Sequence, residues 1–167
     1  EPARAEARLR GALAGLVSVT GVPAEALHFK VRRAQKGETQ YTRQAETGRF
    51  FEVEEHGCRL RVNLDDYLDS GLFLDHRPMR LRLQREAVGK RFLNLFCYTG
   101  TASVHAARGG AAQTVSVDLS NTYLEWASEN FAANGIHARV LQSYSTERPK
   151  HALVRADCLD WMVKAAD

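Results

Sequence analysis

The sequence predicts an α/β fold built on a parallel sheet, preceded by a smaller α+β appendage. An apolar run over residues 92–97 is followed by a turn that contains Gly100, and then by an alanine-rich helix over residues 101–108. Two more short apolar runs, 114–118 and 151–155, are each followed by a helical pattern. Strand, turn and helix repeated in this way are typical of parallel sheets that bind nucleotide-like ligands beside the carboxyl ends of their strands.

Length and composition restrict the class of protein. The 167 residues suffice for one domain or one and a half. No apolar run is long enough to cross a bilayer, and the first residues lack the features of a signal peptide. Cys58, Cys97 and Cys158 are widely spaced and form no metal-binding pattern with histidines. We therefore expect a reduced cytoplasmic protein with no metal site and no membrane partner.

Basic residues are concentrated in the first part of the chain. Residues 1–92 hold 17 of the 23 lysines and arginines and 13 of the 20 acidic residues, a net charge of +4. Five of these cations lie close together around Tyr41: Lys30, Arg32, Arg33, Lys36 and Arg43. Such a cluster can neutralise RNA phosphates, or it can be the solvated face of a charged strand and loop. The sequence leaves both interpretations open.

The first half of the appendage is predicted to contain a helix and a strand. Leucines at helical spacing predict the helix over residues 3–19, which Gly21 and Pro23 end. Alternating apolar and basic residues predict a half-buried strand over residues 27–33. A polar stretch over residues 35–47 has no period and is interpreted as a loop.

A β-hairpin follows. Two strand-like runs, residues 49–55 and 59–63, flank a turn at His56 and Gly57, where the glycine supplies the positive φ of a tight turn. On the second strand Leu60, Val62 and Leu64 share one face, and Arg59, Arg61 and Asn63 share the other.

A polar connector over residues 65–71 marks the expected boundary between residues 1–70 and residues 71–167. The next pattern, residues 72–87, is helical. Pro78 lies within it, so the helix is expected to start near His76 or to be kinked there.

The second part alternates strands with helices. Helices are expected over residues 101–108, 121–134 and 157–165, and strands over residues 92–97, 114–118, 138–141 and 151–155. A polar insertion is expected over residues 143–150. In the last helix we expect Leu159, Met162 and Val163 to face inward.

Three polar clusters fall at the predicted strand ends: the loop over residues 94–100, Asp118 and Asp157. An acid at the end of the second strand can accept two hydrogen bonds from a ribose diol. An acid at the end of the third can accept one from the exocyclic amine of adenine. The alternative for either aspartate is a helix N-cap, since both precede helices. The loop lacks the glycine pattern that cradles a pyrophosphate, so an adenosine ligand without phosphates, S-adenosylmethionine, fits better.

Four segments carry a resemblance to a known family. They are GLFLDHR (71–77), NLFCYTG (94–100), VDLSNTYLEWA (117–127) and ADCLDW (156–161). In this order they resemble motifs of the bacterial rRNA large-subunit methyltransferases, and within them the C-terminal half of the bifunctional 23S rRNA enzymes. That half makes 7-methylguanosine. The resemblance begins near Lys30 and runs to the last residue.

The resemblance implies a partial Rossmann-like class I methyltransferase fold that binds S-adenosylmethionine. Asp118 would contact the ribose, Asp157 and the backbone near Cys158 the adenine, and Arg77 the cofactor carboxylate. The implied cofactor-binding residues are Phe73, His76, Arg77, Asn94, Phe96, Tyr98, Thr99, Gly100, Asp118, Leu119, Asp157 and Cys158. Plain core packing is the alternative for Phe73. Cys97 and Cys158 are interpreted as small apolar residues rather than as nucleophiles.

One departure from the family pattern concerns the target base. Members of the family carry an Asp-Pro-Pro-type motif on a later strand, whereas the four prolines of this chain are not adjacent to one another. We therefore expect a cofactor-binding fragment that is inactive alone, with its catalytic residues in a missing C-terminal part. Its first sheet strand would be left with an unpaired edge, which favours self-association.

The resemblance implies 23S rRNA as the partner and guanine N7 as the methylated atom. A related 5-methylcytosine rRNA methyltransferase is the nearest alternative. A non-catalytic RNA-binding module that uses the cations around Tyr41 is a second. A nicotinamide-dependent oxidoreductase is disfavoured by the missing glycines.

Overall fold

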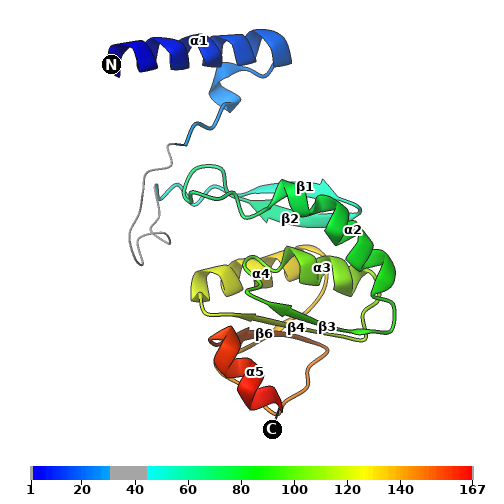
Figure 1. Ribbon diagram of the computed structural model, residues 1–167. Helices are drawn as coiled ribbons and strands as arrows, with labels where there is room; N and C mark the ends of the chain where they lie inside the picture. Colours follow the sequence, from blue (N-terminus) through cyan, green and yellow to red (C-terminus); the bar gives the residue numbers. More distant parts are fainter. Residues whose placement is uncertain (1, 31–44, 167) are drawn as a thin grey trace.

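The computed structural model describes residues 2–30 and 45–166. Its centre is a parallel four-stranded sheet in the order β3-β4-β6-β5, with α3 and α4 on one face and α5 on the other (Figure 1). The strands of this sheet are β3 (Arg91–Leu95), β4 (Gln113–Asp118), β5 (Arg139–Leu141) and β6 (His151–Arg155). The helices are α1 (Pro2–Thr20), α2 (Arg77–Glu86), α3 (Thr101–Arg108), α4 (Asn121–Ala133) and α5 (Cys158–Ala166). The predicted α/β class with a parallel sheet is confirmed.

The predicted hairpin is also confirmed. β1 (Phe51–Glu55) pairs antiparallel with β2 (Cys58–Val62), and Glu55 lies opposite Cys58. The two turn residues between them, His56 and Gly57, both have positive φ, 52° and 76°. A two-residue turn of this kind matches the twist of the flanking strands.

Helix α4 covers the outer edge of the hairpin. Two side chains of α4 and that of its C-cap, Asn134, are four residues apart and therefore on one face, and they bond to the backbone of β2. Asn134 accepts from the Arg59 N–H at 2.9 Å and donates to its carbonyl at 2.7 Å. Asn130 accepts from the Arg61 N–H at 2.7 Å, and Trp126 Nε1 donates to the Arg61 carbonyl at 2.9 Å. The side chains thus satisfy a strand edge that would otherwise be open to pairing with another chain.

The hairpin shares one apolar core with the sheet and its helices. Cys58 and Leu60 of β2 are fully buried against a cluster that also contains Cys97, Val104, Leu124, Ala127, Phe131 and Leu153. A buried ion pair adds a second link, because Arg80 of α2 holds Glu55 of β1 through two hydrogen bonds of 2.6 and 2.8 Å. The predicted boundary after residue 70 stays a prediction, but these contacts join the residues on its two sides.

Several predicted boundaries need adjustment. A short 3-10 helix (Leu74–His76) precedes α2, and Pro78 is the second residue of α2, so the helix starts after His76 without a kink. Residues 27–30 form no strand, and residues 31–33 lie outside the described residues, as does most of the predicted loop over 35–47. A 3-10 turn (Ala24–Ala26) follows α1.

The prediction for the inward face of α5 is wrong. Leu159 and Val163 are 61% and 68% exposed, and Met162 is 39% exposed. The helix instead packs on the sheet through Cys158 and Trp161, which contact the cluster around Val117 and Val154. The predicted helix is present, but it turns a different face to the sheet. That orientation about the helix axis is set by Cys158, whose thiol lies 3.5 Å from the Val117 carbonyl.

Among the residues described, no helix is both long and apolar enough to pass through a membrane.

Candidate cofactor site

The loop that follows β3 has an unusual backbone. Phe96, Tyr98 and Gly100 all have positive φ, 53°, 53° and 68°. For a bulky aromatic residue this conformation is an outlier that persists only where the surrounding structure enforces it, and such outliers gather at functional sites. The loop is therefore the first candidate for a binding element, as the sequence predicts.

Hydrogen bonds to two neighbouring segments, and one within the loop, hold it in place. The Cys97 N–H donates to the Val117 carbonyl at 3.0 Å, and the Gly100 N–H donates to the Cys97 carbonyl at 2.9 Å. The Phe96 N–H lies 3.1 Å from the Cys158 thiol. At Gly100 a side chain is excluded by α4, since a Cβ atom there would lie 2.8 Å from Ala127 Cβ. The lack of a side chain at Gly100 therefore lets the loop backbone pack closely against α4.

Asp118 braces the same loop from the end of β4. One of its oxygens accepts from the Tyr98 N–H at 2.8 Å, and the other accepts from the Ser120 N–H at 2.9 Å. A carboxylate offers about four acceptor positions, so about two are left for a ligand. The N-cap of α4 is Ser120, whose hydroxyl accepts from the Tyr123 N–H. The alternative interpretation of Asp118 as the helix cap is therefore wrong.

Asp157 behaves differently. Its Oδ1 accepts from the Leu159 and Asp160 N–H groups at 2.8 and 3.1 Å, which is the geometry of an N-cap for α5. The capping alternative thus describes what this side chain does in the structure. Its contact with adenine stays a prediction.

Two of the predicted residues face the interior. The Asn94 amide donates to Ser103 of α3 at 2.9 Å, and Ser103 in turn accepts from Ser116 at 2.7 Å. Thr99 is fully buried, and its hydroxyl donates to the Gly71 carbonyl at 2.6 Å. Both side chains therefore fasten the loop to its neighbours.

Aromatic rings form a wall beside the loop. The ring centroid of Phe73 lies 5.3 Å from Tyr98 and 5.6 Å from His76, and Tyr98 lies 4.5 Å from Tyr123. Phe73 is 43% exposed, which does not fit the alternative of plain core packing. Burial raises the pKa of Tyr98, so its phenol stays neutral at ordinary pH. The structure thus brings Phe73, His76 and Tyr98 together, as the resemblance implies.

Exposed apolar side chains lie at the carboxyl ends of two adjacent strands. Phe96 follows β3 and is 69% exposed, and Leu119 follows β4 and is 64% exposed. The parallel register places Leu95 beside Val117, so these residues follow neighbouring strand ends. Exposed apolar groups beside a carboxylate with free acceptor positions match the chemistry of a nucleoside, which has a flat base and a polar diol.

Arg77 lies at the first turn of α2, with its Nε 3.8 Å from a Glu55 oxygen. Its side chain is 60% exposed, whereas Glu55 is buried and already bound by Arg80. The guanidinium is therefore accessible to an anionic group.

The predicted RNA-binding cluster can be described only at Lys30. Its ammonium donates to the Tyr67 carbonyl at 2.5 Å, and burial lowers its pKa despite nearby Asp65 and Asp69. Asp65, Tyr67 and Asp69 all belong to the polar connector over residues 65–71, so Lys30 contacts that connector. The remaining members of the cluster lie outside the described residues: Arg32, Arg33, Lys36 and Arg43.

Sequence reasoning missed the buried polar residues that support the site. Asn130 and Arg80 are buried, with 0% and 2% exposure. Their positions on the inward faces of predicted helices were a usable signal, because a polar residue in an apolar stripe must find a partner there.

Comparisons with known proteins identify the family. The family model for S-adenosylmethionine-dependent methyltransferases matches residues 9–148. Ribosomal RNA large subunit methyltransferase K/L of Allochromatium vinosum is 56% identical over 162 residues, and that of Pseudomonas aeruginosa is 55% identical over the same length. Both alignments cover 97% of this chain, which spans about a fifth of the length of these relatives (21%).

Solved structures show the same fold. The crystal structure of SMU.776 complexed with SAH has a TM-score of 0.62 and 36% identity, and the match covers 73% of this chain and 30% of that one. A SAM-dependent methyltransferase from Agrobacterium tumefaciens has a TM-score of 0.60 at 22% identity, over 77% of this chain and 40% of that one. At this identity the second likeness concerns the fold alone.

The residues at the strand ends fit the expected cofactor. Asp118 has free acceptor positions for hydroxyl groups, and Phe96 and Leu119 supply apolar surface beside it. The predicted fold class and the predicted cofactor are confirmed by the family match. Because that match covers most of the sequence, this chain belongs to the S-adenosylmethionine-dependent methyltransferases.

Proposed function

We propose that this chain is the cofactor-binding portion of an enzyme that methylates guanine N7 in 23S rRNA. The observation that carries the proposal is the identity of 53–56% to ribosomal RNA large subunit methyltransferases K/L over nearly the whole chain. The strained loop after β3, braced by Asp118, supports it as the cofactor-binding element. N7 methylation is the reaction of the C-terminal half of the bifunctional enzymes, which is the half that the motifs resemble.

When bound, S-adenosylmethionine supplies an electrophilic methyl group. Asp118 would accept hydrogen bonds from the ribose hydroxyls, and Phe96, Leu119, Asp157 and the backbone at Cys158 would contact the adenine. Arg77 would pair with the cofactor carboxylate, beside Phe73, His76 and Tyr98. Guanine N7 has a free lone pair without losing a proton, so the chain's residues contribute position and charge environment rather than a general base.

The target-base contacts are proposed to lie outside these residues. The chain contains no adjacent prolines and therefore no Asp-Pro-Pro motif. We accordingly propose that the 167-residue chain binds the cofactor but does not methylate rRNA by itself.

The cofactor test compares two aspartates. Isothermal titration of the chain with S-adenosylhomocysteine should give binding that Asp118→Ala weakens at least about tenfold, since two ribose hydrogen bonds are lost. Asp160→Ala on α5 is the matched control, because Asp160 is exposed there and should change little. Absence of binding by the longer parent enzyme as well would sink the proposal.

Neither Cys97 nor Cys158 fits the role of the nucleophile in the 5-methylcytosine alternative. That alternative needs a reactive cysteine thiolate. Cys97 and Cys158 are buried, with 6% and 2% exposure, and burial raises the pKa of both thiols. In the parent enzyme, we expect methylation to survive both Cys97→Ala and Cys158→Ala. Loss of methylation in either variant, with folding intact, would point to a cysteine nucleophile instead.

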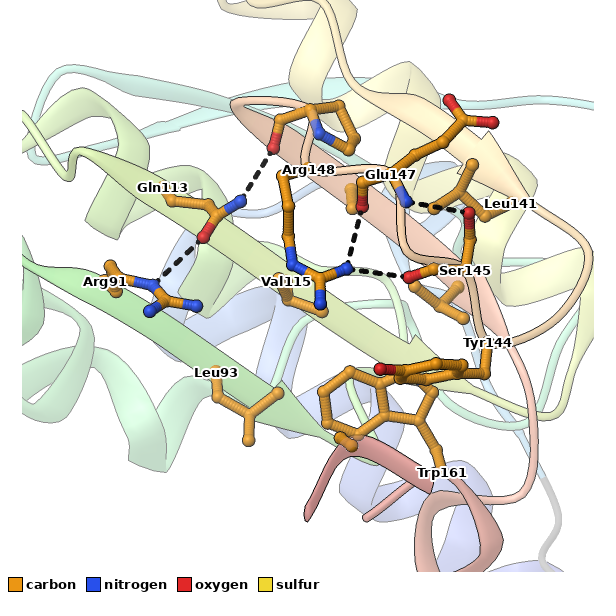
Figure 2. Close-up of a pocket in the computed structure, with 14 residues that line it drawn as sticks. Arg91, Leu93, Gln113, Val115, Leu141, Tyr144, Ser145, Glu147, Arg148 and Trp161 are labelled. Carbon is orange, nitrogen blue, oxygen red and sulfur yellow. Dashed lines mark hydrogen bonds between the residues drawn. The ribbon is translucent and has the colours of Figure 1, made fainter. Parts of the chain in front are cut away.

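The chain is also proposed to self-associate with a second copy through β3. In the described sheet β3 pairs only with β4, and Leu93 on it is 46% exposed. Figure 2 shows Leu93 and Val115 beside Trp161 in a pocket on the α5 side of the sheet. An open strand edge beside apolar surface favours pairing with another chain. Light scattering should detect a concentration-dependent dimer, and a monomer at high concentration would contradict it.

A further inference from the structure

One buried amide joins the hairpin to the cofactor loop. Asn130 on α4 is 0% exposed and uses both ends of its side chain. Its Oδ1 accepts from the Arg61 N–H of β2 at 2.7 Å, and its Nδ2 donates to the Thr99 carbonyl at 2.8 Å. In addition to the shared apolar core, the hairpin, predicted as an appendage, is thus linked to the loop by hydrogen bonds through one side chain.

Thr99 is the point at which the loop is held from two sides. Its carbonyl accepts from Asn130, and its hydroxyl donates to the Gly71 carbonyl at 2.6 Å. The residues on either side of it, Tyr98 and Gly100, have positive φ. A sparsely populated backbone conformation of this kind needs fixed anchors, and Thr99 supplies them between the two left-handed residues.

Asn134, the C-cap of α4 four residues further along the chain, provides a contrast. It bonds to both the N–H and the carbonyl of Arg59, so it docks the hairpin as Asn130 does. Its third contact, with the Asn130 carbonyl, stays within α4. No hydrogen bond recorded for the described residues links Asn134 to the cofactor loop.

We infer that Asn130 is a positioning residue for the cofactor. By holding the Thr99 carbonyl it sets the backbone of residues 96–100, and with it the Tyr98 N–H that bonds to Asp118. The hairpin supports this loop conformation, because the Arg61 N–H of β2 holds the other end of the Asn130 amide. The inference rests on the proposed function only in that the loop binds S-adenosylmethionine.

The test compares Asn130→Ala with Asn134→Ala in the 167-residue chain. Asn130→Ala should speed hydrogen exchange of the Tyr98 and Gly100 amides. It should weaken S-adenosylhomocysteine binding about tenfold, which is the effect expected if the free energy of the lost Thr99 hydrogen bond falls on the cofactor loop. Asn134→Ala should leave both within about threefold of the wild type, although it also loosens the hairpin. Equal effects of the two variants would overturn the inference.

A second variant separates the two ends of the amide and serves if Asn130→Ala does not fold. Asn130→Asp keeps an acceptor for the Arg61 N–H and removes the donor to Thr99. The Arg61 amide should then stay protected while Tyr98 and Gly100 exchange faster, and the opposite pattern would contradict the inference. The exchange measurements need no cofactor. If the wild-type chain and the longer parent enzyme both fail to bind S-adenosylhomocysteine, only the proposed function fails, and the hydrogen-exchange result for the loop still decides the role of Asn130.

Discussion

Removing the Glu55 carboxylate should cause one of the largest losses of stability that a single substitution can produce in this chain. Glu55 and Arg80 are 4% and 2% exposed, and two hydrogen bonds of 2.6 and 2.8 Å join them. Arg80 also donates to the Phe73 carbonyl at 2.8 Å. In Glu55→Ala the guanidinium stays buried without its counter-charge, which costs about 3–5 kcal/mol.

The loss is large compared with the stability of a typical domain. Unfolding free energies are about 5–15 kcal/mol, so Glu55→Ala should remove a substantial fraction and lower Tm by about 10 °C or more. Urea unfolding followed by circular dichroism measures it. Glu52→Ala on the same strand is the control, because Glu52 and its partner Arg59 lie 3.8 Å apart and are about half exposed. That pair should contribute less than about 1 kcal/mol.

A double variant distinguishes an unpaired buried charge from a simple loss of packing. Glu55→Leu with Arg80→Met removes both charges, and it should be more stable than Glu55→Ala alone. The reasoning would be refuted by a loss below about 1 kcal/mol in Glu55→Ala, or by a double variant less stable than the single one.

Three further predictions concern stability. Gly71→Ala should lower the free energy of unfolding by about 2–4 kcal/mol, since its φ is +88° and a Cβ would lie 2.1 Å from the Trp126 ring. Gly48→Ala is the control, because its φ is +62° but no atom lies near the added Cβ, so it measures the cost of the backbone conformation alone. Asp66→Ala should lower the free energy of unfolding in urea by about 1–3 kcal/mol, because the Asp66 carboxylate accepts four hydrogen bonds from Thr47, Gly48 and Asn63. Asp75 is exposed, so Asp75→Ala is the control and should leave the stability unchanged. Burial lowers the pKa of His105 and His151, so the unfolded state binds more protons and stability should fall as the pH drops below about 6.5. Hydrogen bonds hold the pKa of Asp66 at about 2, which adds a further loss below about pH 4; a urea midpoint unchanged between pH 7.5 and pH 5 would contradict the histidine part.

Local patterns in the sequence determined most of the elements. The helix over residues 101–108 and the strand over residues 151–155 have the predicted bounds, because apolar periodicity and the flanking turn residues are properties of neighbouring positions. The hairpin turn at His56 and Gly57 was predictable for the same reason. The order of polar residues at strand ends also pointed to an adenosine cofactor, since parallel strands bring their carboxyl ends to one edge.

Only the tertiary structure decided how these elements support one another. The α5 residues predicted to face inward are exposed, because the rotation of the helix depends on Cys158 packing under a strand some forty residues earlier. The distinction between Asp118, which braces the loop, and Asp157, which caps a helix, depends on which N–H groups each carboxylate meets. Asn130 and Arg80 join segments 25 to 69 residues apart. Pairings at such separations are set by packing rather than by local pattern, so the support of the cofactor loop could be read only from the folded chain.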